Sequence, residues 1–382
     1  MNALTTNYMG LLLKNPIIAS SAGTTQKLEQ MKKAEAAGAG AVIMKSFFER
    51  KDFRSDHTPH FMILKRKIGA FRADTLYSCE QASSLDETEY AEEIFKAKKE
   101  LSIPVIANID CYNYQESIRI SKMFAEAGAD ALEIKACPTG ELSLAGNSYQ
   151  DVIGKVLTGL KAEIKIPITV KLVGQLDDPV KTALYLEKAG ANGITLFNRL
   201  AALDIDIETE APILHGGYAG HGGLWAIYYS LRWISALYPA TKLPICGSGG
   251  VYTGEDVAKY ILSGACSVAI CTSILLNGYE IIDRIKAELT KWMEKKNYNT
   301  IEEFIGKAVY RVKGNEDINR EKRVTAWIND DRCSLCGGCF RSCFHGAIDF
   351  SADYCRVKPE ICKGCGLCLH VCPLKAIELK EI

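Results

Sequence analysis

Eight cysteines near the C-terminus occur as two copies of one spacing, C-x2-C-x2-C-x3-C. The first copy begins at Cys333 and the second begins 29 residues later, at Cys362. Three thiolates on one tight loop can hold three irons of an iron–sulfur cubane, so the pattern predicts one-electron chemistry at this end of the chain. The candidate ligands are Cys333, Cys336, Cys339, Cys343, Cys362, Cys365, Cys368 and Cys372.

This spacing resembles that of bacterial ferredoxins with two 4Fe-4S clusters, in which the fourth cysteine of each run binds the cluster of the other run. One departure is Phe344, which follows the first run where Pro373 follows the second. Proline is not a ligand, so the departure concerns the loop and not the cluster. Cys355, between the runs, is expected to be a packed thiol. The resemblance implies the ligand sets Cys333/Cys336/Cys339/Cys372 and Cys362/Cys365/Cys368/Cys343.

Zinc and disulfides are the alternative uses of so many cysteines. Zinc usually takes two pairs of ligands rather than two fourfold runs. Disulfides suit secreted chains, but residues 1–10 have neither the basic nor the apolar region of a signal peptide. Fifteen cysteines without a secretory signal indicate a reducing compartment, and we expect the protein to be cytoplasmic.

The bulk composition limits the classes of partner. Lysine plus arginine and aspartate plus glutamate both number 46, so no overall charge draws the chain to nucleic acid or to an anionic membrane. No apolar run approaches the roughly 18–20 residues that span a bilayer. A chain of 382 residues is long enough for two domains.

Eight short apolar runs rich in Ile and Val predict buried parallel strands in the first 275 residues. Segments of helical length, at 87–101, 115–127, 149–164 and 179–189, separate several of them. Helices are expected to end at Gly38, Gly128, Gly190 and Gly264, because glycine closes the last turn in the left-handed conformation. The strands are expected at 16–19, 41–44, 104–109, 131–134, 167–172, 193–197, 244–246 and 267–271.

Eight such units predict an α/β fold, either a (β/α)8 TIM barrel or a doubly wound sheet, and their total length favours the barrel. Residues 3–14 are expected to form a hairpin before the first strand. We expect the barrel domain at 1–313, a charged linker at 314–325 and a small α+β ferredoxin-type domain at 326–382.

Barrel chemistry takes place at the C-terminal ends of the strands. Gly249 and Gly250 follow the seventh strand, and Thr272 and Ser273 follow the eighth. Glycine lets backbone N–H groups approach a phosphate closely, so the two segments predict a phosphate site. Lys171 ends the fifth strand, where its ammonium could stabilise an anionic reduced flavin ring. Residues 216–223, rich in glycine, are expected to form a flexible loop that could close over a cofactor.

With these pieces the chain resembles the dihydroorotate dehydrogenase superfamily of FMN barrels, and within it the branch that couples the barrel to a two-cluster ferredoxin domain. The matching segments include NPIIASSAG at 15–23, ADALEIKACP at 129–138 and ICGSGG at 245–250. The resemblance implies that FMN is bound by Ser20, Ser21, Ala22, Lys45, Ser46, Asn108, Lys171, Asn198, Gly249, Gly250, Thr272 and Ser273.

The resemblance also implies that Cys137 is the active-site acid or base, which exchanges a proton with one carbon while flavin N5 exchanges hydride with its neighbour. The family's asparagine before this cysteine is absent here, where Lys135 and Ala136 stand instead. By position alone, further polar contacts are expected from Arg199, Glu80, Gln81 and Asn113.

The expected function is oxidation or reduction of a C–C bond in a small cyclic substrate of the dihydropyrimidine or dihydroorotate type. Electrons would pass through the clusters to a redox partner, either a ferredoxin or an NAD(P)H-oxidising flavoprotein subunit, and a homo- or hetero-oligomer is expected. The alternative is an electron-transfer or docking subunit whose barrel has lost catalysis, which the altered segment before Cys137 motivates.

Overall fold

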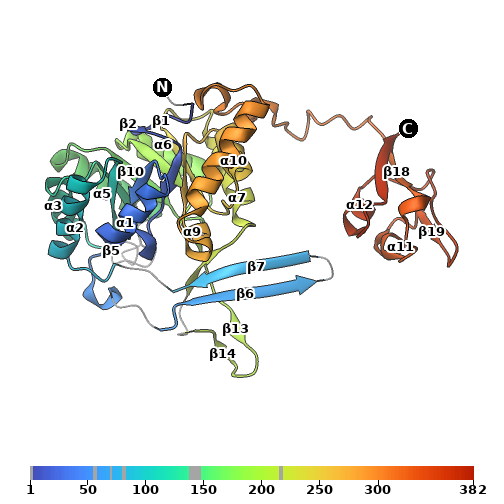
Figure 1. The fold of residues 1–382 in the computed structure, drawn as a ribbon, viewed down its shortest axis with the longest axis horizontal. Helices are drawn as coiled ribbons and strands as arrows, with labels where there is room; N and C mark the ends of the chain where they lie inside the picture. Colours follow the sequence, from blue (N-terminus) through green and yellow to red (C-terminus); the bar gives the residue numbers. More distant parts are fainter. Residues whose placement is uncertain (1–2, 55–57, 69–70, 80–82, 137–147, 215–217) are drawn as a thin grey trace. The chain divides into compact units, whose positions relative to one another are not determined.

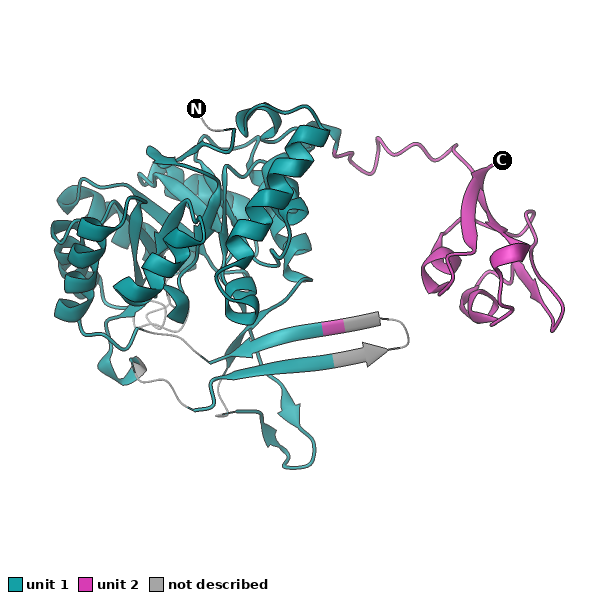
Figure 2. Cartoon of the chain, in the orientation of Figure 1, with its two compact units in different colours: residues 1–65, 74–311 teal, residues 66–73, 312–382 magenta. Residues whose placement is uncertain are grey.

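The structure is a computed structural model that describes residues 3–54, 58–68, 71–79, 83–136, 148–214 and 218–382. The chain divides into two compact units, residues 1–65 with 74–311 and residues 66–73 with 312–382 (Figure 2). Each unit is described by itself.

The first unit is built around eight parallel strands that close on themselves, in the order β4-β3-β17-β16-β11-β10-β9-β8 with β4 paired to β8 (Figure 1). The predicted TIM barrel is therefore confirmed, and the doubly wound sheet is excluded. The short strand β5 (Phe47–Phe48) also pairs with β8. The barrel strands are β3 (Ile17–Ala19), β4 (Ala41–Ile43), β8 (Val105–Cys111), β9 (Ala131–Ala136), β10 (Ile168–Leu172), β11 (Gly193–Leu196), β16 (Ile245–Ser248) and β17 (Ser267–Ile270).

Helices lie between successive strands and pack on the outside of the barrel. Side-chain oxygens cap several of their first turns, as Asp86 does at α2 and Thr253 at α8. The four glycines expected at helix ends all have positive φ, between 95° and 113°. The helices are α1 (Leu28–Ala36), α2 (Glu87–Glu100), α3 (Tyr114–Glu126), α5 (Tyr149–Glu163), α6 (Pro179–Lys188), α7 (Ala226–Leu237), α8 (Gly254–Leu262), α9 (Thr272–Asn277) and α10 (Ile281–Lys295).

The predicted N-terminal hairpin is present as β1 (Thr6–Tyr8) and β2 (Leu11–Leu13). Tyr8 is fully buried, and its hydroxyl lies 2.7 Å from Thr169 Oγ1 of β10. The hairpin therefore packs against residues at the N-terminal ends of the barrel strands, and the opposite ends are left for a ligand.

A four-stranded antiparallel sheet, in the order β12-β15-β7-β6, lies beside the C-terminal ends of the barrel strands (Figure 1). Its strands are β6 (Phe61–Ile68), β7 (Phe71–Ser78), β12 (Leu200–Ala202) and β15 (Ala219–Gly222), and a small hairpin of β13 (Ile205–Asp206) and β14 (Ala211–Pro212) follows β12. The prediction of a flexible loop is wrong for residues 219–222, because their backbone pairs with β7 and β12. Residues 215–217 lie outside the described part.

In the second unit, residues 312–323 are exposed and lead into β18, which begins at Val324, so the expected linker overlaps this strand at its last two residues. Two antiparallel pairs, β18 with β21 and β19 with β20, and two short helices enclose a small core of aliphatic and cysteine side chains. The elements are β18 (Val324–Ile328), α11 (Gly338–Ser342), β19 (Ile348–Phe350), β20 (Cys355–Val357), α12 (Leu367–Val371) and β21 (Ile377–Glu381).

Candidate active site

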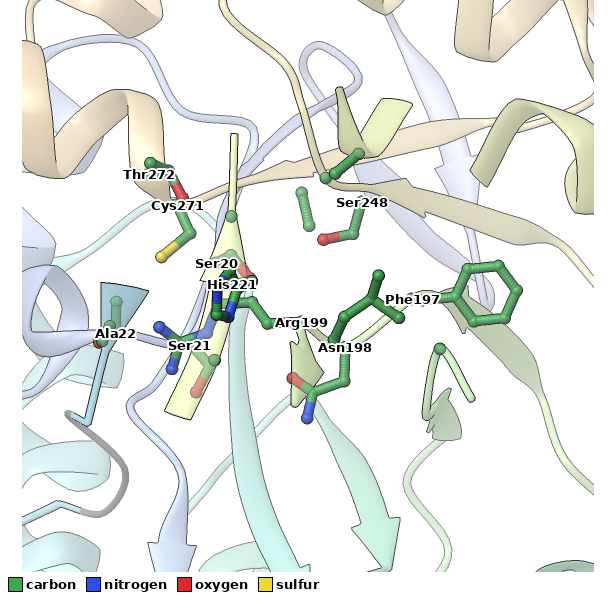
Figure 3. Close-up of a pocket in the computed structure, with 18 of the residues that line it drawn as sticks. Ser20, Ser21, Ala22, Phe197, Asn198, Arg199, His221, Ser248, Cys271 and Thr272 are labelled. Carbon is green, nitrogen blue, oxygen red and sulfur yellow. The ribbon is translucent and has the colours of Figure 1, made fainter. Parts of the chain in front are cut away.

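A cavity of about 270 Å³ lies at the C-terminal ends of the barrel strands (Figure 3). Eleven of the twelve residues predicted to hold FMN line it, although they come from six different strand ends. They are Ser20, Ser21, Ala22, Lys45, Ser46, Lys171, Asn198, Gly249, Gly250, Thr272 and Ser273.

The twelfth residue, Asn108, does not line the cavity, because β8 continues to Cys111 rather than ending near residue 108. Its side chain is fully buried, and its Nδ2 donates a hydrogen bond of 2.7 Å to Glu133 Oε1. Alternate residues of a strand share a face, so Asp110 on the same strand comes to the mouth instead, and it does line the cavity.

Glu133 is a fully buried carboxylate on the neighbouring strand β9. Its Oε2 accepts a hydrogen bond of 2.8 Å from Thr195 Oγ1, and its Oε1 lies 3.7 Å from Lys171 Nζ. A buried ammonium is costly without an opposite charge, so Glu133 supplies the counter-charge for Lys171 at the cavity wall. Glu133 could not be singled out from the sequence, because a lone Glu within a strand carries no motif.

The predicted phosphate end of the cavity has the backbone geometry that requires glycine. Gly249 and Gly250 both have positive φ, at 104° and 69°. A Cβ atom at Gly250 would lie 2.6 Å from the Ile227 backbone nitrogen, so no larger residue fits there. Thr272 and Ser273 begin α9 on the adjacent strand end, as predicted.

The end of β4 contributes Lys45 and Ser46, which are buried to 2% and 7% exposure. The Lys45 backbone oxygen accepts a hydrogen bond of 3.0 Å from the Tyr90 hydroxyl. Ser46 Oγ lies 3.1 Å from Ser21 Oγ, so the first two strand ends are joined at the cavity wall.

A second ion pair lies on the cavity wall, between Lys135 of β9 and Asp110 of β8. Lys135 Nζ is 2.8 Å from Asp110 Oδ2, and it also lies 4.8 Å from the ring centroid of Phe48. Burial raises the pKa of Asp110, and the Lys135 ammonium partly offsets that rise. Asp110 Oδ1 is buried and has no hydrogen-bond partner among the described residues, which leaves one acceptor for a ligand.

The antiparallel sheet supplies one wall of the cavity. Its strand β15 was predicted from the sequence as a loop. Arg199, which was expected by position, and His221 of β15 both lie at the cavity in Figure 3. His221 Nδ1 is buried without a hydrogen-bond partner among the described residues, and its ring packs edge-on to Tyr77 of β7. His221 lies within the glycine-rich segment noted in the sequence, but only its pairing with β7 brings it to the mouth.

Three other predicted residues, Cys137, Glu80 and Gln81, lie outside the described residues. Asn113 lies at the start of α3, where its Oδ1 accepts hydrogen bonds from the backbone of Gln115 and Glu116. This contact makes Asn113 a helix cap, and it does not line the cavity.

In the second unit, Cys333, Cys336, Cys339 and Cys372 surround one small cavity, and Cys355 lines it as well. These four are one of the two ligand sets that the spacing implied. Backbone N–H groups of Ala326 and Gly364 donate to Cys362 Sγ, and that of Ala376 donates to Cys372 Sγ. Burial raises the pKa of the Cys362 thiol, but hydrogen bonds to its sulfur, those of the two N–H groups among them, outweigh burial and the net shift is downward. Such donors favour the thiolate that binds iron.

The same part of the structure bears on the zinc alternative. No group of three His, Cys, Asp or Glu side chains among the described residues is placed to hold a single metal ion. Four thiols around a cavity suit a larger cluster of iron and sulfide better than one zinc ion.

Comparison with known families decides between these possibilities. The profile of the dihydroorotate dehydrogenase family matches residues 3–293, and that of the 4Fe-4S dicluster domain matches residues 326–379. The chain belongs to the dihydroorotate dehydrogenase family. As a member of this family it is an oxidoreductase acting on CH–CH groups, with a ferredoxin-type iron–sulfur domain for electron transfer.

Some relatives match nearly the whole chain, and others match about four fifths of it. It is 28% identical to the NAD-dependent dihydropyrimidine dehydrogenase subunit PreA of Escherichia coli K12, over 99% of this chain and 96% of the relative. It is 29% identical to the catalytic subunit of dihydroorotate dehydrogenase B (NAD(+)) of Thermoplasma volcanium, over 81% of this chain and 100% of the relative. The corresponding subunit of Pyrococcus furiosus is 28% identical over 78% of this chain and 96% of its own length. Among the described residues, no helix has the length and apolar character needed to cross a membrane.

Proposed function

We propose that the protein is an FMN-dependent dehydrogenase for a dihydropyrimidine or a dihydroorotate-type ring, with two 4Fe-4S clusters that relay electrons to an outside partner. The observation that carries the proposal is the convergence of eleven residues, predicted from six separate strand ends, on one cavity. Such a convergence on the C-terminal face of a barrel is what a cofactor site requires.

The cavity fits FMN at both ends. Gly249 and Gly250 would hold the phosphate through their backbone N–H groups, with the hydroxyls of Thr272 and Ser273 beside them. Lys171, paired with Glu133, would face the ring and favour its reduced anionic form. When bound, FMN supplies the atom that exchanges hydride with the substrate.

The substrate would meet the pair formed by Asp110 and Lys135. The open Oδ1 of Asp110 can accept a hydrogen bond from a ring N–H, and Lys135 can donate one to a ring carbonyl. Cys137, two residues after Lys135 in the sequence, is our candidate for the acid or base that exchanges the proton on carbon.

The cysteine runs fit two clusters, one for each ligand set, and so a carrier of single electrons. The chain shows no dinucleotide fingerprint, so NAD(P)H would enter through a separate flavoprotein subunit, or the partner would be a ferredoxin. A flavoprotein subunit would make a hetero-oligomer, whereas a ferredoxin would leave a homo-oligomer possible. The cysteine content favours the cytoplasm.

One experiment distinguishes the FMN-dependent dehydrogenase from the second candidate, a docking subunit with an inactive barrel. Protein purified without oxygen is assayed for iron and extracted flavin, is then reduced, and is mixed with uracil, thymine or orotate while flavin absorbance is followed. The dehydrogenase is expected to bind FMN and to be reoxidised by at least one ring. FMN that no ring reoxidises would favour the docking subunit, and protein with iron but no flavin would overturn the proposed cofactor.

A further inference from the structure

The two halves of the ferredoxin-type domain are not identical around their cysteines. Ala326 of β18 and Cys355 of β20 lie 29 residues apart, which is the same offset that relates Cys333 to Cys362. Both are buried in the domain core, at 5% and 2% exposure. The repeat therefore places a methyl group in one half where the other half has a thiol.

That thiol reaches one predicted cluster site. Cys355 Sγ lies 3.4 Å from Cys339 Sγ, and Cys355 lines the cavity that Cys333, Cys336, Cys339 and Cys372 surround. Five sulfurs thus meet at a site where a 4Fe-4S cluster uses four. The ferredoxin spacing assigns Cys333, Cys336, Cys339 and Cys372 to the cluster, so Cys355 is left as a neighbour of the ligands.

A neighbouring thiol can change the cluster that it contacts. When Cys339 is a thiolate bound to iron it has no proton, so the S–H of Cys355 is the only donor in this contact. A hydrogen bond to a cluster sulfur stabilises the more negative, reduced state, and hydrogen bonds to sulfur are one of the factors that set cluster potentials. At the other site, the methyl group of Ala326 offers no such donor.

We infer that Cys355 is a positioning residue that donates a hydrogen bond to Cys339 and raises the reduction potential of the cluster held by Cys333, Cys336, Cys339 and Cys372. This donor has no side-chain counterpart at Ala326, and it shifts an electron entering the domain toward the cluster beside Cys355. The inference depends on the clusters of the proposed function, but not on its flavin or its substrate.

The test is a reductive titration of the whole protein, prepared without oxygen and followed by electron paramagnetic resonance. Cys355→Ala places in this half the residue that the other half already carries, and we expect it to keep eight irons. The midpoint of one cluster should fall by about 59 mV, a tenfold shift of a one-electron equilibrium, while the other stays in place. Cys355→Ser keeps an O–H donor and should restore most of the shift.

The reciprocal variant, Ala326→Cys, provides a matched control. It should raise the midpoint of the other cluster, and combining it with Cys355→Ala should shift the two midpoints in opposite directions. Unchanged midpoints in Cys355→Ala with eight irons present would overturn the inference. Loss of four irons in that variant would also overturn it, because Cys355 would then be a ligand. Wild-type protein without iron would refute the proposed clusters themselves, which is a different result.

Discussion

The Oε1 atom of Glu133 and the Nζ atom of Lys171 lie 3.7 Å apart on neighbouring strands inside the barrel. Glu133 is fully buried and does not line the cavity, whereas Lys171 does. Asn108 and Thr195 donate hydrogen bonds to the same carboxylate. The two hydrogen bonds fix the position of the Glu133 carboxylate in the barrel core, beside the Lys171 ammonium at the cofactor site.

Replacing Lys171 by methionine is expected to leave the Glu133 carboxylate buried without its cation. Removing one partner of a buried pair typically costs about 3–5 kcal/mol. We expect the free energy of unfolding to fall by about 3 kcal/mol, because two hydrogen-bond donors remain, and FMN to bind more weakly. Urea unfolding of Lys171→Met, Glu133→Gln and the double variant measures the coupling. Strictly additive effects in the double variant would show that the two side chains do not interact.

Replacing Cys137 by alanine is expected to slow substrate-dependent flavin turnover by about 10²–10⁴, the usual contribution of a positioned acid or base. FMN content and the cluster spectra should stay as in the wild type. Cys266→Ala is the matched control, since this cysteine is buried beside the Ile245 backbone and lies outside the cavity. Full turnover in Cys137→Ala, measured by stopped-flow absorbance, would remove Cys137 from the mechanism.

The titration of the Asp110 carboxyl should make the melting temperature of the protein depend on pH. Its pKa is raised in the folded protein, mainly by burial, so the native state binds more protons than the unfolded chain at pH values above about 4. This contribution to stability is present at low pH and is lost as pH rises through the raised pKa. The wild type should therefore lose melting temperature relative to Asp110→Asn as pH rises above about 4.

Lys135→Met tests the sign of this effect. Without the ammonium, which lowers the pKa of Asp110, the loss of melting temperature should extend to higher pH. Thermal unfolding followed by circular dichroism at steps of pH gives both difference curves. A wild-type melting temperature that rose relative to that of Asp110→Asn as pH increased would contradict the prediction.

Replacing Gly250 by alanine is expected to abolish tight FMN binding, because the new methyl group meets the Ile227 backbone at the predicted phosphate site. Gly10→Ala is the control, since Gly10 also has positive φ, 85°, but no atom lies within 4 Å of the added carbon. Gly10→Ala should therefore cost only about 1–2 kcal/mol of backbone strain and retain FMN. Equal FMN content in the two variants, measured after extraction, would argue against phosphate binding at Gly250.

Much of the fold was readable from the sequence because its signals are local. Runs of Ile and Val mark strands buried on both faces, and the glycines at the helix ends mark where each helix must stop. Once eight strands are parallel, their C-terminal ends must meet at one mouth. That is why residues as far apart as Ser20 and Ser273, which the family resemblance implied, meet in one cavity.

The errors arose where pairing is non-local or a strand is longer than its apolar run. Residues 219–222 have no β-branched side chains, and they form a strand only because β7 offers them a partner edge. Asp110 and Lys135 lie near the ends of β8 and β9, after the apolar run of each strand has ended. The sequence therefore predicted shorter strands than the structure has.

The sequence by itself determined the barrel and the ferredoxin-type cysteine spacing, because strand period, helix ends and ligand spacing are properties of neighbouring residues. Its resemblance to a known family supplied most of the residues around the cofactor cavity. Only the tertiary structure decided that Glu133 holds Lys171, that His221 faces the cavity and that Cys355 touches Cys339. Those contacts join residues of separate strands or segments, and their distances depend on how the elements pack, which no local pattern specifies.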